Sequence, residues 1–420
     1  MDMAQSVRIE PDLKFIKELQ AVGGESLKKC YQCATCSVAC PISPQGNPYP
    51  RKEMIWAQWG LKDKLLSDPD IWLCHNCGGC SDLCPRGAKP ADLMSAMRNM
   101  AYRNIVPCSA IGTWMSSAKF LPVLLGIPAV LFGLIWYFVA KLNLWSSLAD
   151  GGYWLFKSEA AHGVPYGVFK PGSWLPDGNI VFGKLFYGDF TIDLLFGLVA
   201  LFVLFTFVKG VRNLIKTIGP DGSTMVLGKR RSVLCCLIDV IVSEILTHKK
   251  FVDCGSAAEK ASRKNGHMAL FYGFICLAVV TTLVAGGHWV GRIPGLEFLA
   301  LHTPMPLYHP VKLLAIVGTL LLLVGLTLLT ARRSSLDPTK QSSSFYDWYL
   351  LGVIWFVGLT GLGSMLLRLA DIAPLAYFVY YLHLVSVFML FAYLPWSKLG
   401  HLVYRTAALT YVRYLGRRPL

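Results

Sequence analysis

Eight of the thirteen cysteines in the chain fall into two runs of identical spacing. The runs are Cys30-x2-Cys33-x2-Cys36-x3-Cys40-Pro41 and Cys74-x2-Cys77-x2-Cys80-x3-Cys84-Pro85. A [4Fe–4S] cluster needs four thiolates, and in two-cluster domains with this spacing the last cysteine of each run binds the other cluster. We therefore predict two [4Fe–4S] clusters with crossed ligands: Cys30, Cys33, Cys36 and Cys84 for cluster 1, and Cys74, Cys77, Cys80 and Cys40 for cluster 2.

Zinc is the main alternative metal, because it also binds four thiolates, but zinc sites usually show paired CxxC sequences. The 33 residues between the two runs include RKEMIWAQWGLKDKLL, which reads as a helix. The sequence therefore predicts a helical ferredoxin domain over residues 1–118. The remaining cysteines lack ligand spacing and are predicted to be packing residues: Cys108, Cys235, Cys236, Cys254 and Cys276.

The rest of the chain has the composition of a membrane protein. Of 420 residues, 54% are hydrophobic and 15% are charged, whereas soluble domains carry about 25% charged residues. Six apolar runs are each near the roughly 20 residues that a helix needs to cross a bilayer. They lie at about 120–140, 190–208, 268–290, 311–331, 348–368 and 373–396. We expect an all-α protein in which a six-helix transmembrane domain, residues 119–420, follows the ferredoxin domain.

The distribution of Lys and Arg predicts how these helices are oriented. The net charge is +15, and the basic residues gather in the connection 209–264 and after the fourth and sixth runs, whereas 291–308 holds one Arg. We therefore expect a protein of the cytoplasmic (inner) membrane. By the positive-inside rule, its cluster domain and both termini face the cytoplasm. The polar start, Met1 to Cys30, has no apolar h-region of a secretory signal. Because the basic residues lie between apolar runs, we do not expect nucleic acid as a partner.

The connection between the second and third runs contains SVLCCLIDVIVSEILTHKKF. Apolar and polar residues alternate there at helical spacing. We predict an amphipathic helix at about 230–252, lying on the membrane or against the cluster domain, with a structural role.

Four histidines lie within or at the ends of the apolar runs. His383 is inside a run, where an ionisable group is functional by default. His401 follows 18 residues later, and His267 and His288 bracket the third run, 21 residues apart. In straight helices these separations are about 27 and 31 Å. Because the two helices run in opposite directions, His267 is level with His401, and His288 with His383.

Facing histidines on different helices can hold haem b. The pair His267 and His401 predicts an inner haem, and His288 with His383 predicts an outer one, which gives a cytochrome b-type bundle with one or two haems. His302 and His309 lie on the outer side as well and could replace His288. His309 and Lys312 form a polar pair that could bind a quinone carbonyl or a haem propionate, unless the lysine only snorkels to the interface.

These residues resemble known families. The double CxxCxxCxxxCP domain looks like the C subunit of heterodisulfide reductase. The helices resemble the gamma subunit of respiratory nitrate reductase and the haem subunit of heterodisulfide reductase, on the strength of His267, His383 and His401-LVY. The fusion is similar to the C subunit of the quinone-interacting membrane-bound oxidoreductase complex. One position differs from the nitrate reductase pattern. Those subunits carry a second histidine ten residues after the first, and this chain has Leu277 there. The ligand of the outer haem therefore stays open.

The resemblance implies a chain that oxidises menaquinol within a membrane complex. Its partners would be flavin-containing, heterodisulfide reductase A-like subunits, leading to adenylylsulfate reductase in sulfate respiration. We thus expect an electron conduit from quinol through haem b and two clusters to a soluble partner. The alternative is a heterodisulfide reductase-type or other respiratory membrane subunit with the reverse electron direction.

Two other functions fit the sequence poorly. A catalytic heterodisulfide reductase needs a CC pair followed by CxxC, and no CxxC occurs after Cys84. An ion transporter needs paired carboxylates inside the membrane, and Asp193 is the one acidic residue within an apolar run.

Overall fold

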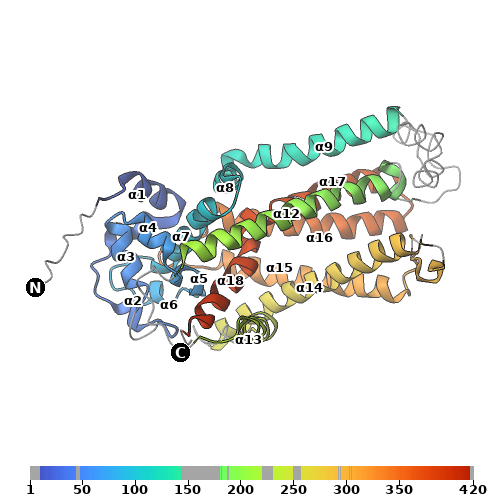
Figure 1. The fold of residues 1–420 in the computed structure, drawn as a ribbon. Helices are drawn as coiled ribbons and strands as arrows, with labels where there is room; N and C mark the ends of the chain where they lie inside the picture. Colours follow the sequence, from blue (N-terminus) through green and yellow to red (C-terminus); the bar gives the residue numbers. More distant parts are fainter. Residues whose placement is uncertain are drawn as a thin grey trace, which may run out of the picture.

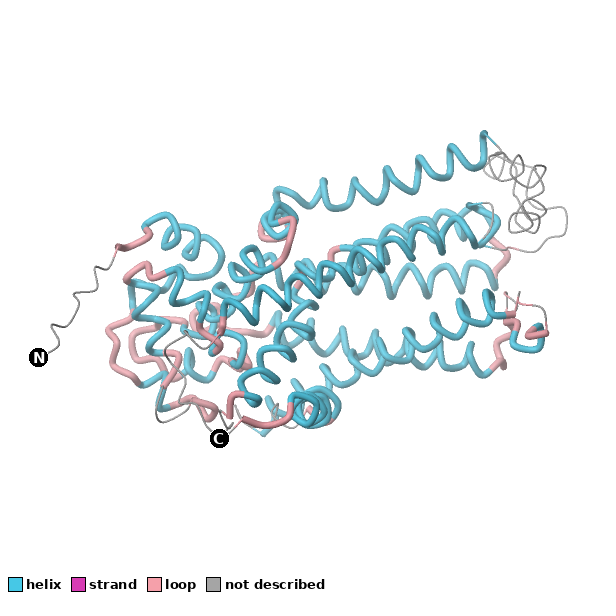
Figure 2. The backbone as a smooth tube through the Cα atoms, in the orientation of Figure 1, coloured by secondary structure: helices cyan, strands magenta, loops and turns pink. Residues whose placement is uncertain are grey.

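The computed structural model describes residues 10–43, 48–142, 180, 182–186, 189–219, 230–248, 257–291, 293, 295–301, 303 and 305–416. Across these residues every regular element is a helix and no strand occurs (Figure 2). The prediction of an all-α protein is confirmed. Short helices, coloured blue, gather at one end, and long helices run away from them side by side (Figure 1).

The N-terminal part is built around one amphipathic helix, α7 (Pro90–Ile105), which buries Met94, Met97 and Ala101. The helices packed on it include α1 (Leu13–Leu19), α3 (Arg51–Gln58), α4 (Lys62–Ser67) and α5 (Asp70–Leu73). α1 begins after Asp12, whose carboxylate accepts a hydrogen bond from the Phe15 backbone N–H at 2.9 Å and so caps the helix.

Six long helices follow the short ones. They are α9 (Leu121–Leu142), α12 (Asp189–Thr217), α14 (Ala257–Val290), α15 (Pro310–Ser334), α16 (Phe345–Leu369) and α17 (Ala373–Ala392). All six contain a stretch long and apolar enough to cross a membrane. The six predicted spans are confirmed, and the chain is a multi-pass membrane protein. The connection 141–189 lies largely outside the described residues.

The predicted depths of the histidines in the membrane assume one straight helix from His383 to His401. The structure differs. α17 ends at Ala392, and two short 3-10 turns, Leu394–Trp396 and Lys398–Gly400, follow. α18 (His401–Tyr414) then starts and packs on α5, α12 and α13 (Val233–Val240). Pro395 cannot donate the backbone hydrogen bond that would continue α17. His401 therefore stands at the start of a separate helix that reaches the N-terminal part.

The predicted amphipathic segment is helical, as α13 (Val233–Val240) and the π-helical turn Ile241–Leu246. Cys236 and Val240 of this segment are buried, Val233 and Leu234 are exposed, and α13 packs against α18. Arg413 of α18 binds the segment through Glu244 at 2.6 Å and Asp239 at 2.8 Å. The segment is thus fixed to α18 rather than to the cysteine motifs.

Glycines let α14 and α15 approach closely. A Cβ at Gly273 would lie 2.7 Å from Leu322 N, and a Cβ at Gly318 would lie 2.8 Å from Cys276 Cβ. A Cβ at Gly325 would collide with Leu270 N and lie 2.9 Å from Gly266 O. Small residues at a membrane helix interface allow this backbone contact, because lipid supplies no hydrophobic force to hold the helices together.

Polar contacts join the N-terminal part to the loop between α15 and α16. Asp92 of α7 accepts hydrogen bonds from Ser342, at 2.9 Å from its N–H and 2.5 Å from its hydroxyl. Lys89 Nζ donates to Pro338 O at 2.6 Å. At the start of α16, Asp347 pairs with Arg333 at 3.0 Å and with Lys398. The loop is therefore anchored on both sides.

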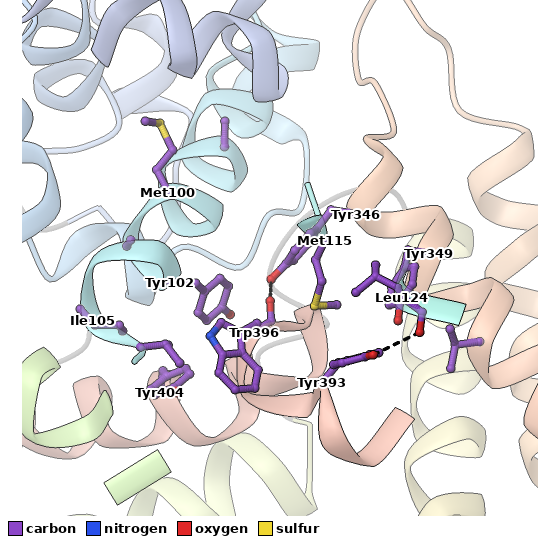
Figure 3. Packing of buried hydrophobic residues seen from close by; sticks show 14 of the residues in the cluster. Met100, Tyr102, Ile105, Met115, Leu124, Tyr346, Tyr349, Tyr393, Trp396 and Tyr404 are labelled. Atoms are coloured by element: carbon purple, nitrogen blue, oxygen red, sulfur yellow. Dashed lines mark hydrogen bonds between the residues drawn. The ribbon is translucent and has the colours of Figure 1, made fainter. Parts of the chain in front are cut away.

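An aromatic cluster, defined here as Trp72, Tyr102, Tyr346, Trp396 and Tyr404, fills the boundary between the two parts. Figure 3 shows the last four meeting from α7, α16, the turn after α17, and α18. The Tyr102 ring lies 5.6 Å from those of Trp72 and Tyr404, measured between centroids. Trp396 Nε1 donates to Pro107 O at 2.8 Å. Because these large side chains are buried together, the two parts form one continuous core.

Replacing Gly325 by Ala should destabilise the α14–α15 pair. The added methyl group meets backbone atoms of α14 that cannot move independently, and overpacking of this kind typically costs about 1–3 kcal/mol. We expect a lower thermal unfolding midpoint in detergent. Gly352→Ala in α16, where no atom lies within 4 Å of the added Cβ, is the control. Equal midpoints for the two variants would contradict the packing argument.

Candidate functional site

The two cysteine motifs fold in the same way. In each, the second residue after the first cysteine has a left-handed backbone, with φ of 60° at Gln32 and 51° at Asn76. This turn directs its N–H at the preceding sulfur: Gln32 N lies 3.4 Å from Cys30 Sγ, and Asn76 N lies 3.3 Å from Cys74 Sγ. Such N–H groups stabilise negative charge on sulfur, which a metal-bound thiolate carries.

A short helix then carries the third cysteine of each motif: α2 (Thr35–Val38) holds Cys36, and α6 (Gly79–Asp82) holds Cys80. A second left-handed residue precedes each helix, Ala34 with φ of 70° and Gly78 with φ of 91°. α2 and α6 contact each other, which brings the motifs together.

One serine in each motif fixes the motif to a neighbouring helix. The hydroxyl of Ser37 accepts the Arg51 N–H at the start of α3, and that of Ser81 accepts the Ala91 N–H at the start of α7, both at 3.1 Å. Each hydroxyl satisfies a backbone donor that the first turn of a helix leaves without an intrahelical partner. The cysteine loops are therefore held by rigid elements.

Charge interactions between the thiols group most of the eight cysteines as the two predicted sets require. Cys36 lies close enough to Cys30, Cys33 and Cys84 for their charges to raise its pKa. Cys40 interacts in this way with Cys74 and Cys77 of the other run, and Cys80 with Cys74, Cys77, Cys40 and, more weakly, Cys36. The last cysteine of each run thus faces the opposite motif. The ligand sets themselves stay a prediction.

Burial makes these thiols poor acids in the absence of a metal. It raises the pKa of Cys36 to about 11 and that of Cys40 to about 12, and it raises the pKa of the Cys74 and Cys80 thiols as well. Exposed Cys33 differs, because a hydrogen bond with the Thr35 side chain lowers its pKa. Buried thiols that converge in this way are poor nucleophiles, and iron would stabilise them as thiolates. The donor set therefore fits two cubane clusters.

His401 is held in the tautomer that a metal ligand needs. Its Nδ1 lies 2.5 Å from Lys398 O. Because a carbonyl oxygen can only accept, Nδ1 carries the proton and Nε2 keeps its lone pair. Burial lowers the pKa of His401 to about 4, so the ring is neutral at physiological pH.

His267 lies near His401 and is oriented by a third histidine, His248. His267 and His401 interact electrostatically, and His267 Nδ1 lies 2.8 Å from His248 Nε2. His248 Nδ1 approaches Leu246 O at 3.5 Å and burial lowers the pKa of His248, so its Nε2 is the acceptor. His267 therefore donates through Nδ1, and its Nε2 carries no proton. Ligand histidines commonly donate their other N–H in this way.

The predicted inner pair is therefore brought together, and the donor set fits a haem iron. The two rings come from different helices and each has Nδ1 engaged. Their role as a pair of haem ligands stays a prediction. The sequence reasoning missed His248, at the end of the amphipathic segment. Its position was the available signal: a histidine at the end of an amphipathic helix can lie beside the ends of the membrane spans.

His383 lies against α16. Its Nδ1 is 3.1 Å from Thr360 Oγ1, whose own proton goes to Phe356 O at 2.5 Å, so Nδ1 donates and Nε2 keeps its lone pair. A Cβ on Gly361 would lie 3.0 Å from His383 Cε1, which shows how closely the ring approaches α16. The ring of His288 contacts that of Trp289, at 5.6 Å between centroids. The pairing of His288 with His383 stays a prediction.

The remaining residues predicted for the outer side of the membrane are His302, His309 and Lys312. His309 Nδ1 accepts the Val311 N–H at 3.3 Å, which makes this side chain the N-cap of α15. Lys312 is partly buried and lies near Arg368 of α16. His302 and Cys254 lie outside the described residues.

A buried group of three carboxylates near the segment before Cys74 has a structural explanation. Glu53, Asp68 and Asp70 surround Lys52 Nζ, at 3.6, 2.6 and 2.5 Å. Their oxygens lie close enough together to hold a cation, and the lysine ammonium supplies one. The group fixes α3 to the segment that leads into Cys74.

Comparison with known proteins agrees with this geometry. Residues 26–88 match the model of a 4Fe-4S dicluster domain. The chain is 42% identical over 93 residues to the C subunit of the H(2):CoB-CoM heterodisulfide,ferredoxin reductase of Methanothermobacter marburgensis, which covers 22% of this chain and 50% of that protein. It is 38% identical over 78 residues to the iron-sulfur C subunit of the CoB--CoM heterodisulfide reductase of Methanopyrus kandleri, covering 19% and 41%.

A further relative is similar over almost the whole chain. Citrate utilization protein B of Escherichia coli is 23% identical over 423 residues, which covers 97% of this chain and 95% of that protein. By contrast, the chain spans about half the length of the Methanothermobacter marburgensis protein. No solved structure matches. The N-terminal region is thus a 4Fe-4S dicluster domain like that of the heterodisulfide reductase C subunits, and a membrane domain of six spans follows it.

Replacing Cys77 by Ser should remove one of the two clusters. Iron in the anaerobically purified chain should fall from about eight to about four atoms, because one cubane loses a thiolate. Cys235→Ser is the control, since Cys235 is exposed and outside both motifs. An unchanged iron content in Cys77→Ser would contradict its role as a ligand.

Proposed function

We propose that the chain is the membrane subunit of a quinone-linked oxidoreductase, passing electrons between menaquinol and a soluble partner. Haem b and two [4Fe–4S] clusters, when bound, would supply the one-electron chemistry. Oxidation of one quinol releases two electrons and two protons. The observation that carries the proposal is the contact of the histidine site with the cysteine domain through α18: His401 opens this helix and Arg405, one turn on, reaches the loop of Cys74.

The residues support a fixed order of centres. His267 and His401 would hold the haem through Nε2, with Lys398 O and His248 orienting the rings. Cluster 2 would be next, because the Cys74 loop touches α18, and cluster 1 would be last. A second haem at His288 and His383, and a quinone or propionate contact at His309 and Lys312, are further proposals for the outer side. At His309 only Nε2 is available for such a contact, because Nδ1 caps α15.

Cluster 1 would lie near the surface, where a partner could take the electrons. Cys33 is exposed, and Tyr31 and Val38 beside it are 69% and 87% exposed. The Arg86 guanidinium lies over the Tyr31 ring at 4.1 Å. An apolar patch beside a basic group suits a protein partner. By resemblance this partner is a heterodisulfide reductase A-like flavoprotein, leading to adenylylsulfate reductase. Absence of any flavoprotein from a complex purified in mild detergent would contradict this.

Replacing His401 by Ala should remove the inner haem. We expect the dithionite-reduced α band, near about 560 nm for haem b, to lose the inner haem's share. Any outer haem would keep its own contribution. Cys235→Ser is again the control, because Cys235 is exposed and lies outside the histidine site.

Two results would contradict the haem assignment. A full α band in His401→Ala would exclude His401 as a ligand. Absence of the band from the wild-type protein would exclude haem b altogether, and with it this route between quinol and the clusters.

We infer a cytoplasmic position for the cluster domain from the basic residues at its end of the bundle. Arg333, Lys398 and Arg405 lie there, and the positive-inside rule places such ends in the cytoplasm. Protease should therefore cleave the domain in inside-out vesicles and spare it in right-side-out vesicles. The opposite pattern would reverse the topology.

A further inference from the structure

Arg405 lies between the histidine site and the cysteine loop that would hold cluster 2. It lies four residues after His401, and therefore on the same side of α18. It interacts electrostatically with His401 and with His267. On the other side, its Nη2 contacts His75 Nδ1 at 2.5 Å and Leu73 O at 3.4 Å. These two residues flank Cys74.

The contact has a defined chemistry. A guanidinium can only donate, so His75 Nδ1 accepts and its proton is on Nε2. The bond between Arg405 and His75 therefore requires a neutral histidine in one tautomer. Because the donor is charged, the bond is stronger than one between neutral groups. It holds the first half of the Cys74–Cys77 loop against α18.

The guanidinium is also a buried positive charge. Burial lowers the pKa of Arg405, but a guanidinium stays protonated in proteins. Its Nε is buried without a hydrogen-bond partner, so its described polar contacts are those made by Nη2. Its strongest charge interaction is with Glu244 of the amphipathic segment, and it also interacts with the Cys74 thiol. Arg98 interacts with this thiol as well and donates to Cys74 O at 3.3 Å. Little solvent screens a charge in this position.

We propose that Arg405 is a positioning residue that couples the two centres: it fixes the Cys74 loop to the histidine helix and favours the reduced state of cluster 2. This inference rests on the proposed function. In the transfer, the centre held by His267 and His401 loses one electron and is oxidised, and cluster 2 gains it and is reduced. The reduced cluster carries one more negative charge, which the nearby cation stabilises. Arg405 itself exchanges neither a proton nor an electron.

The test uses the full chain in detergent and two substitutions with different expectations. Arg405→Met removes both the charge and the donors, so the midpoint potential of one cluster, followed by EPR during redox titration, should become more negative. Oxidation of the reduced haem by the clusters should slow by about tenfold, which corresponds to about 1.4 kcal/mol in the barrier. Arg405→Lys keeps the charge but not the two-point contact, so the potential should stay near that of the wild type while the rate falls.

Arg413→Met is the matched control. Arg413 is a buried arginine on the same helix, but it pairs with Asp239 and Glu244 of the amphipathic segment and not with the cysteine loop. Its loss should leave both cluster potentials unchanged.

Three results would overturn the inference. The first is an unchanged cluster potential in Arg405→Met, and the second is an equal shift of that potential in Arg413→Met. The third is loss of the clusters from both Arg405 variants, because Arg405 would then be a purely structural residue. Each presumes a wild-type protein with a haem band and two cluster signals. If the wild type lacks these signals, the proposed function fails instead.

Discussion

The burial of α18 against the cysteine domain is the interaction on which the rest of the structure depends. The aromatic cluster joins α5, α7, α16 and α18 in one apolar core, with Tyr102 and Tyr404 at its centre. A large apolar contact of this kind does not rotate or slide freely, unlike the smaller and more polar interfaces between mobile domains. The distance between the cysteine loops and the histidines is therefore set by packing. A relay for single electrons needs a fixed distance of this kind, because centres held within one chain cannot approach each other by binding and separating.

The features set by local patterns could be predicted from the sequence. Cysteine spacing predicted two metal sites, and apolar runs of sufficient length predicted six spans. Both signals are short-range: each needs only neighbouring residues or one helix. Basic residues between the runs predicted an orientation by the same kind of reasoning, and that orientation stays a prediction.

The features that depend on tertiary contacts could not be predicted. His248 is a neighbour of His267 only in the folded chain, where its backbone is left-handed with φ of 50° and its ring meets that of His267. The contact between Arg405 and His75 joins residues 330 positions apart. His267 and His401 were paired on the assumption of a straight helix through residue 401. The structure brings them together through a break after Ala392 and a separate helix instead.

The exchange of the fourth cysteine between the two motifs has a consequence for biogenesis. If Cys84 completes cluster 1 and Cys40 completes cluster 2, neither half of the domain offers four thiolates alone. Iron insertion would then have to wait until the ribosome has released residue 84, and both cubanes would become possible at nearly the same moment. All six membrane spans are translated after this point. A nascent chain could thus acquire its metal before its hydrophobic part reaches the insertion machinery.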